Sequence, residues 1–307
     1  MREGSKKVSV LLTGASGLLG QALIGRFRDR KVLGISRSGK NGTRVCDLTQ
    51  ETSTRRLFEN HDFSLVIHTA AYSDVDGCER NPRLAHESNC LATRLLASEC
   101  GRRFVPLVVV STDYVFDGQK KTPYQASDLP CPVNIYGMTK LAGEFEATRL
   151  APLLAIVRTS WLFGPSNPDN FVNKMLSRLK SETLVRVLDD QVDAPTYVED
   201  LAIAIEKIGY RWLGLAKKKR AQFQEVFQVC NRGIATRLLM TLKMRDWLGL
   251  KGVRVERIDP NELKGRTALR PKRPVMSAKK YETFFHCRLR NWQESLKEYV
   301  LMNGPIK

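Results

Sequence analysis

The fold of this chain is decided by residues 8–20, Val8-Ser-Val-Leu-Leu-Thr-Gly-Ala-Ser-Gly-Leu-Leu-Gly20. The apolar run Val8–Leu12 has the length of a strand, and a helical pattern follows the third glycine. Glycines at this spacing allow a tight turn, a close approach of the backbone to a pyrophosphate, and close packing of the helix on the strand. The stretch therefore predicts a dinucleotide-binding turn, with cofactor contacts from Gly14, Ser16, Gly17, Leu18, Leu19 and Gly20.

Strand-like and helical segments alternate from this turn as far as Trp161. We expect strands at 8–12, 31–36, 64–68, 104–111 and 153–159, and helices at 18–30, 52–60, 82–101 and 136–149. Such alternation builds parallel βαβ units with right-handed crossovers. The predicted fold class is α/β, a Rossmann-type doubly wound parallel sheet with a smaller C-terminal α/β substrate lobe.

The regular alternation ends after Gly164, where a loop rich in proline and asparagine precedes a helical stretch at 170–180. We assign residues 1–165 to a dinucleotide-binding domain, to which the chain returns around 196–230. Residues 166–195 and 231–307 form the predicted substrate-binding lobe. The basic run Lys217-Lys-Lys-Arg220 is interpreted as an exposed connection between a helix and a strand.

Composition excludes several classes of protein. Hydrophobic residues make up 42% and charged residues 27% of the 307 residues, which argues against a disordered or collagen-like chain. The apolar runs are far shorter than the roughly 20 residues of a membrane span. The seven cysteines are odd in number and include no Cys-x-x-Cys pair, which favours reduced thiols and a cytoplasmic location. The four histidines show no zinc spacing, and we expect no metal.

The charge is unevenly distributed along the chain. The formal net charge is +18, of which residues 211–307 contribute +15 and residues 1–210 only +3. A basic field favours anionic partners, such as a diphosphate substrate, a nucleic acid or an acidic protein surface. Net charge by itself does not choose among these partners.

The end of the second expected strand indicates the form of the cofactor. An acidic residue there would bind a ribose 2′-hydroxyl, whereas a basic residue would accommodate a 2′-phosphate. Residues 34–40 contain no carboxylate and include Arg37, which favours NADP(H), with NAD(H) left open as an alternative. Asp47 and Leu48 follow a short third strand, where this fold places contacts to the adenine.

Three residues form the candidate catalytic group. Tyr136 and Lys140 are four positions apart on one predicted helix and so share a face, where the ammonium would lower the pKa of the phenol. Thr112 ends an expected strand, and parallel sheets carry their chemistry at the carboxyl ends of their strands. The Thr112 hydroxyl is placed to bind a substrate carbonyl oxygen while Tyr136 protonates it.

At this point the sequence resembles a known family, that of dTDP-4-dehydrorhamnose reductase within the extended short-chain dehydrogenases. The motifs that carry the resemblance span most of the chain and are 13–20, 70–76, 111–118 (Ser-Thr-Asp-Tyr-Val-Phe-Asp-Gly), 136–144, 158–161, 170–171 and 189–196. Related sugar dehydratases place a glutamate directly after the Thr-Asp pair, whereas this chain has Tyr114. The resemblance therefore implies reduction rather than dehydration.

The resemblance also implies roles for individual residues. A hydride would pass from the nicotinamide to C4 of a nucleotide-linked 4-keto-6-deoxy sugar, with Tyr136 as proton donor and Lys140 holding the nicotinamide ribose. The cofactor would further contact Ala71, Tyr72 and Ser73. The implied substrate contacts are Thr112, Asp113, Trp161, Asn170 and Arg270.

Two positions depart from the family pattern. The family usually has glycine where this chain has Asp193, which puts a carboxylate near the expected site. Some members bridge subunits with magnesium through a glutamate two residues past the third glycine, where this chain has Ala22. The second departure agrees with the expectation of no metal.

Two further hypotheses of function remain open at this stage. The beta subunit of methionine adenosyltransferase resembles the same reductases and binds a catalytic partner, so a regulatory NADP-binding subunit is the alternative to an enzyme. Nucleic-acid binding through the basic C-terminal third is disfavoured, because no interleaved aromatics or known module accompany the charge. The expected partner is a nucleotide sugar, a homodimer is left open, and no membrane association is expected.

Overall fold

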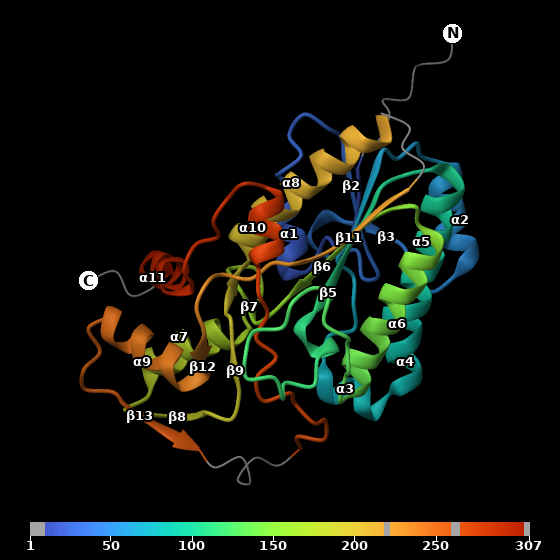
Figure 1. Cartoon of the computed structure of the whole chain (residues 1–307). Helices are drawn as coiled ribbons and strands as arrows, with labels where there is room; N and C mark the ends of the chain where they lie inside the picture. The colour runs from blue at the N-terminus through green and yellow to red at the C-terminus, as the bar shows by residue number, and fades with distance from the viewer. Residues whose placement is uncertain (1–9, 218–221, 259–264, 304–307) are drawn as a thin grey trace.

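The computed structural model describes residues 10–217, 222–258 and 265–303. Its centre is a seven-stranded parallel sheet with the strand order β11-β6-β5-β4-β1-β2-β3 (Figure 1). The strands are β1 (Val10–Thr13), β2 (Val32–Ser36), β3 (Arg44–Val45), β4 (Leu65–His68), β5 (Leu107–Thr112), β6 (Leu153–Thr159) and β11 (Phe223–Gln228). The sheet confirms the predicted α/β fold class.

Helices cover both faces of this sheet, as a parallel sheet requires. Helices α1 (Leu18–Ile24), α8 (Val198–Lys217) and α10 (Lys279–Phe284) pack on one face, in a core that includes Leu23, Ile205 and Tyr281. Helices α2 (Glu51–Glu59), α5 (Ala92–Arg103) and α6 (Ile135–Leu150) pack on the other face, around Phe58 and Leu96 (Figure 1).

The segment between β4 and β5 is a chain of short helical pieces. It runs through α3 (Val75–Arg80), α4 (Pro82–His86), a π turn (Glu87–Leu91) and α5. The expected helix at 82–101 is thus present, with a π turn inside it. Single π turns are frequently found at functional sites, and this one lies directly beside α6.

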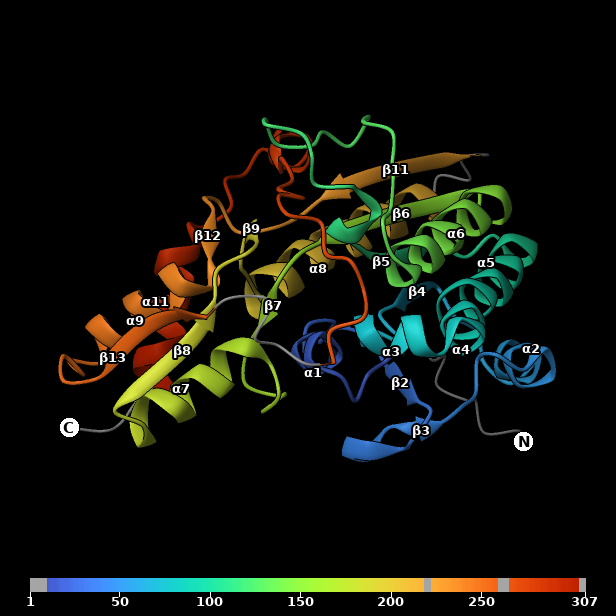
Figure 2. The same ribbon diagram turned by 90° about the horizontal axis from the view of Figure 1, so that it is seen from below.

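A second group of elements forms a smaller lobe beside the sheet (Figure 2). Its helices α7 (Phe171–Ser181), α9 (Arg237–Trp247) and α11 (Trp292–Asn303) share a core with the parallel pair β8 (Leu184–Leu188) and β13 (Arg254–Ile258). Two short pairs join the lobe to the sheet region: β7 (Leu162–Phe163) with β10 (Thr196–Tyr197), and β9 (Val192–Asp193) with β12 (Ala235–Thr236). The domain boundaries drawn from the sequence stay a prediction.

Some boundaries differ from those expected. Helix α1 ends at Ile24 rather than at residue 30, because Gly25 leaves the helical conformation. Strand β5 begins at Leu107 rather than at residue 104, because Phe104 adopts a left-handed conformation that ends α5. Most of the basic run at 217–220 lies outside the described residues. Within the described ranges, no helix has both the length and the apolar character to cross a bilayer.

Candidate active site

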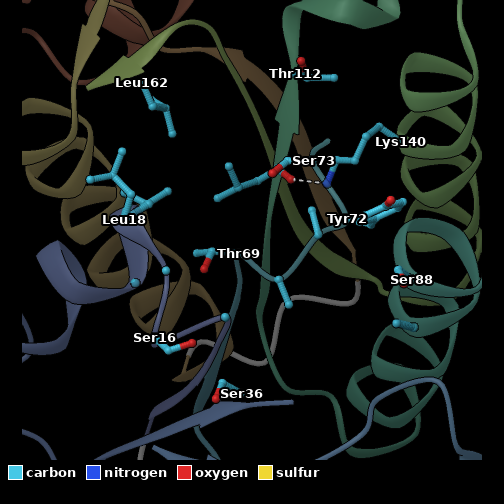
Figure 3. A pocket seen from close by; sticks show the side chains of 18 of the residues that line it. Ser16, Leu18, Ser36, Thr69, Tyr72, Ser73, Ser88, Thr112, Lys140 and Leu162 are labelled. Carbon is cyan, nitrogen blue, oxygen red and sulfur yellow. Dashed lines mark hydrogen bonds between the residues drawn. The ribbon is translucent and has the colours of Figure 1, made fainter. Parts of the chain in front are cut away.

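A cavity of about 730 Å³ opens at the carboxyl ends of the central strands. The glycine turn after β1, the loop after β4 and the end of β5 all contribute to its lining. Figure 3 shows Ser16 and Ser36 toward one end of this cavity and Thr112 toward the other, with Lys140 reaching in from α6. This is the edge of a parallel α/β sheet where ligands bind.

The glycine turn is packed so closely that side chains would not fit. Gly14 has a left-handed φ of 65°, and a Cβ there would lie 2.6 Å from the Ala70 nitrogen. A Cβ at Gly20 would overlap the Gly14 carbonyl oxygen. Gly17 precedes α1 without any side-chain cap, so the N–H groups at the start of the helix have no side-chain acceptor, and residues 17–20 line the cavity. The turn therefore suits a pyrophosphate, which needs backbone donors at short range.

All of the residues expected to bind the cofactor line this one cavity. They are Gly14, Ser16, Gly17, Leu18, Leu19, Gly20, Arg37, Asp47, Leu48, Ala71, Tyr72, Ser73, Tyr136 and Lys140. Arg37 is exposed and follows β2, and Asp47 accepts hydrogen bonds from the backbone and hydroxyl of Thr49. Their individual roles stay predictions, but their common location fits an extended dinucleotide.

The loop after β4 is held by a residue that the sequence analysis missed. The Asn89 side chain accepts a hydrogen bond from the Tyr72 nitrogen at 2.8 Å and donates one to the Tyr72 carbonyl at 3.1 Å. It also donates to the Thr139 hydroxyl on α6. Asn89 therefore ties the loop 70–73 to the helix that carries Tyr136 and Lys140. No sequence motif singles it out, because its partners are 17 and 50 residues away.

Helix α6 places Tyr136 and Lys140 at the cavity. Asn134 caps the helix by accepting a hydrogen bond from Gly137, so Tyr136 falls in the first turn. The Lys140 ammonium donates to the Val110 carbonyl at 2.7 Å, and burial lowers the pKa of Lys140 to about 8. The two side chains lie in one cavity, as the i, i+4 spacing predicts.

The expected lowering of the Tyr136 pKa is not what the structure shows. Burial raises the pKa of the Tyr136 phenol, and its hydrogen bond with Thr112 opposes this rise only in part. The nearby charge of Asp113 raises the pKa further. The expectation was wrong here because it counted the cation and left out the cost of charging a fully buried phenol.

Thr112 is the last residue of β5 and is central to the polar contacts of the site. Its hydroxyl donates to Asp113 Oδ1 at 2.9 Å and accepts from the Tyr114 nitrogen at 3.2 Å. It is also hydrogen-bonded to Tyr136. Thr112 and Asp113 both line the cavity, beside the phenol of Tyr136.

Of the remaining expected substrate contacts, two line the cavity and one does not. Trp161 and Asn170 line the cavity, and Trp161 has a left-handed φ of 39°, a strained conformation for a bulky residue. The Asn170 side-chain oxygen caps α7 by accepting from the Asn173 nitrogen, and its amide nitrogen donates to the Gly164 and Asn167 carbonyls in the preceding loop. Arg270 does not line the cavity, and its guanidinium instead forms a two-pronged ion pair with Asp76.

A second arginine at this end was not expected from the sequence. Arg237, the first residue of α9, lies over the rings of Trp161 and Phe171 at 5.2 and 5.6 Å from their centroids. Residue 237 is far from every motif in the chain, and only the packing of the lobe on the sheet brings it to Trp161.

Comparisons with known proteins agree with this architecture. Residues 8–303 match the family model described as RmlD substrate binding domain. The dTDP-4-dehydrorhamnose reductase of Mycolicibacterium smegmatis is 32% identical over 296 residues, covering 95% of this chain and 84% of that protein. The chain belongs to the dTDP-4-dehydrorhamnose reductase family.

Two solved structures of this family have the same fold over almost the whole chain. The dTDP-4-dehydrorhamnose reductase of Clostridium acetobutylicum superposes with a TM-score of 0.84 at 30% identity, covering 96% of this chain and 99% of that one. The enzyme of that name from Bacillus anthracis, solved in complex with NADP, gives a TM-score of 0.85 at 28% identity with the same coverage. The resemblance drawn from the motifs is confirmed, and with it the expectation of an oxidoreductase.

In the three described ranges, no group of three or more His, Cys, Asp or Glu side chains converges in a way that would hold an ion. The expectation that this member works without a metal stays a prediction. All seven cysteines are free thiols.

Proposed function

We propose that this protein reduces the C4 carbonyl of a dTDP-linked 4-keto-6-deoxy sugar, with NADPH as cofactor and Tyr136 as proton donor. The observation that carries the proposal is the convergence of Thr112, Tyr136 and Lys140 on the cavity that also contains the glycine turn. NADPH supplies the hydride when it is bound. The Arg37 side chain beside the end of β2 suits the 2′-phosphate that distinguishes NADPH from NADH.

Three side chains would carry out proton donation, binding of the keto oxygen and binding of the nicotinamide ribose. The Tyr136 phenol donates its proton to the keto oxygen as negative charge develops there. A phenol whose pKa is raised by burial holds its proton at neutral pH, which suits a donor in the direction of reduction. The Thr112 hydroxyl binds the same oxygen, and Lys140 holds the nicotinamide ribose.

The sugar nucleotide would occupy the end of the cavity nearest the lobe. Trp161 offers an apolar ring to the sugar. The Arg237 guanidinium lies over that ring and would place a positive charge near the diphosphate. Arg270 would act at the nucleotide only if substrate drew it from Asp76, so we assign it a structural role first. We place the protein in the cytoplasm, where its free thiols would stay reduced.

Turnover tests this proposal directly. The loss of NADPH absorbance is followed with dTDP-4-keto-6-deoxy-L-mannose generated in situ, for the unmodified protein and for Tyr136→Phe. Removing the proton donor should lower kcat by roughly 10² to 10⁴-fold while NADPH still binds. Tyr210→Phe, a change of the same kind on the surface of α8, should leave kcat unchanged.

Two results would contradict the proposal. A Tyr136→Phe variant that keeps normal kcat would remove Tyr136 as the proton donor. An unmodified protein that binds NADPH tightly but reduces no dTDP-4-keto-6-deoxy sugar would favour the regulatory-subunit hypothesis instead.

A further inference from the structure

Two carboxyl groups from distant parts of the chain meet beneath the active site. Asp113 follows β5 directly, and Asp193 ends β9 in the connection to the lobe. Their side chains are 3% and 0% exposed. Asp113 Oδ1 accepts from the Thr112 hydroxyl, and Asp193 Oδ1 accepts from the Ala194 nitrogen at 2.8 Å. Both Oδ2 atoms are buried and have no hydrogen-bond donor of their own. The Ser160 hydroxyl lies beside Asp193 but donates to the Ala194 carbonyl. The two carboxyl groups lie within hydrogen-bond reach of each other.

A shared proton reconciles these observations. An ionised carboxyl group accepts hydrogen bonds and cannot donate them, so two neighbouring carboxylates in a buried position would repel each other. A proton between the two carboxyl groups turns this repulsion into a hydrogen bond. It also leaves one negative charge on the pair instead of two, which lowers the cost of burial.

The surroundings give the pair no positive charge to offset a second ionisation. Within the described ranges, no lysine or arginine is among the main influences on the pKa of either carboxyl group. The titratable groups that face the pair are Tyr114, Tyr136 and Cys230, which are neutral at pH 7, and burial raises the pKa of each further. Burial raises the pKa of Asp113 to about 6 and that of Asp193 well above its ordinary value, where repulsion by Asp113 adds to it.

The pair acts on the site through Thr112. A hydroxyl has one proton to donate, and in the structure Thr112 donates it to Asp113. A fully ionised Asp113 would hold that proton by a charge-assisted hydrogen bond, about twice as strong as a neutral one. A proton shared with Asp193 weakens this hold, so the Thr112 hydroxyl is freer to turn to a substrate carbonyl oxygen.

We propose that Asp113 and Asp193 share a single proton and that Asp193 is a positioning residue, which acts through Asp113 on the Thr112 hydroxyl during carbonyl reduction. The second half of this inference rests on the proposed function, whereas the shared proton does not. As pH rises through the loss of the shared proton, Asp113 binds the Thr112 hydroxyl more tightly and kcat falls.

The variant Asp193→Asn keeps the shape of the side chain but removes the group that can gain or lose the shared proton. Its amide can donate to Asp113 Oδ2 at every pH and cannot ionise. We expect the alkaline fall in kcat to move to higher pH or vanish in this variant, with KM little changed. Asp193→Ala leaves Asp113 as a lone carboxylate and should lower kcat at pH 7 by roughly tenfold. The exposed acid Asp62 provides the control, and Asp62→Asn should leave the pH profile unchanged.

Two measurements test the shared proton without any turnover. Infrared difference spectra at neutral pH should show the band of a buried neutral carboxylic acid in the unmodified protein and not in Asp193→Asn. The folded state binds this proton more tightly than the unfolded chain, so the unmodified protein loses stability as pH rises above about 4. As pH rises from 5 to 8, the Tm of Asp193→Asn should therefore increase relative to the Tm of the unmodified protein.

Each result supports or overturns a defined part of the inference. Identical infrared spectra and parallel Tm profiles would overturn the shared proton. A confirmed proton with the same kcat profile in Asp193→Asn would overturn the positioning role. If the unmodified protein reduces no substrate while its infrared band is present, the proposed function and the positioning role fail and the shared proton stands.

Discussion

Burial sets the protonation of individual side chains in this site more strongly than neighbouring charges do. Lys140 shows this clearly, because its ammonium lies in a buried position with the Val110 carbonyl as hydrogen-bond acceptor. Glu144, one turn further along α6, raises the pKa of Lys140, but burial lowers it by more. The buried charge of Lys140 therefore destabilises the fold at neutral pH.

Lys140→Met should stabilise the protein at neutral pH. The folded-state pKa of about 8 lies below the unfolded value of about 10.5, so the cost of burying the charge is fully present below pH 8 and disappears as pH rises through that window. We expect a gain of about 2 kcal/mol at pH 7, after allowing for the lost hydrogen bond to Val110.

Urea unfolding at pH 7 and at pH 10.5 measures this effect. The gain should shrink at the higher pH, and Lys251→Met, a change at an exposed lysine, should show no such pH dependence. A Lys140→Met variant that is less stable than the unmodified protein at pH 7 would refute the proposed burial cost.

Among the elements, helix α6 depends on a close approach to the end of β5. A Cβ at Gly137 would overlap the Tyr114 carbonyl oxygen and lie 3.0 Å from the Pro132 side chain. The next residue back is Tyr136, so the distance between the helix and the turn after β5 also sets the distance between the phenol and Thr112. Glycine at 137 is therefore required by packing, although its position in a helix is unfavourable by itself.

Gly137→Ala should push the start of α6 away from the turn at 113–115. We expect kcat to fall by roughly tenfold or more, because small displacements of a catalytic group are costly, and stability to fall by about 1–3 kcal/mol. The matched control is Gly214→Ala in α8, where an added Cβ meets nothing within 4 Å, and it should be neutral or stabilising. Normal kcat in Gly137→Ala would show that the helix position is not limiting.

At the scale of the whole molecule, one carboxylate links the sheet domain to the late part of the chain. Asp76 in α3 accepts hydrogen bonds from the Thr267 and Ala268 nitrogens and from both terminal nitrogens of Arg270. These contacts, above all the bond to Arg270, hold the pKa of Asp76 well below its ordinary value. The partners are more than 190 residues apart, so this link joins the first half of the chain to its last part.

Asp76→Asn should lower stability at pH 7 by about 1–3 kcal/mol, because an amide oxygen accepts fewer and weaker hydrogen bonds than a carboxylate. A carboxyl group whose pKa is lowered in the folded state stabilises the fold at pH values above its pKa in the unfolded chain. This contribution is lost as pH falls below about 4. Urea unfolding at pH 7 and pH 3 should therefore show a difference that shrinks at the lower pH.

The exposed pair of Asp246 with Arg245 offers the comparison for this experiment. Asp246→Asn should change stability by less than about 1 kcal/mol at either pH. An equal loss in both variants would mean that the Asp76 link contributes no more than an ordinary surface ion pair.

The sequence by itself determined the sheet domain and the group of residues around the cofactor and the reacting carbonyl. Gly14, Gly17 and Gly20 are close in the chain, and Tyr136 and Lys140 are one helical turn apart, so local spacing already implies their geometry. Thr112 and the loop at 71–73 could be placed because the strands of a parallel sheet end at one edge. For these residues, the secondary structure alone specifies where the side chains lie.

Only the tertiary structure decided the rest of the site. The ion pair of Arg270 with Asp76, the position of Arg237 over Trp161, and the carboxyl pair of Asp113 and Asp193 all join residues from separate elements. The pKa of Tyr136 belongs with them, because it depends on how much surrounding chain excludes water. Spacing along a sequence carries no information about such contacts, since they arise from how the lobe packs on the sheet and which polar groups that packing isolates from solvent.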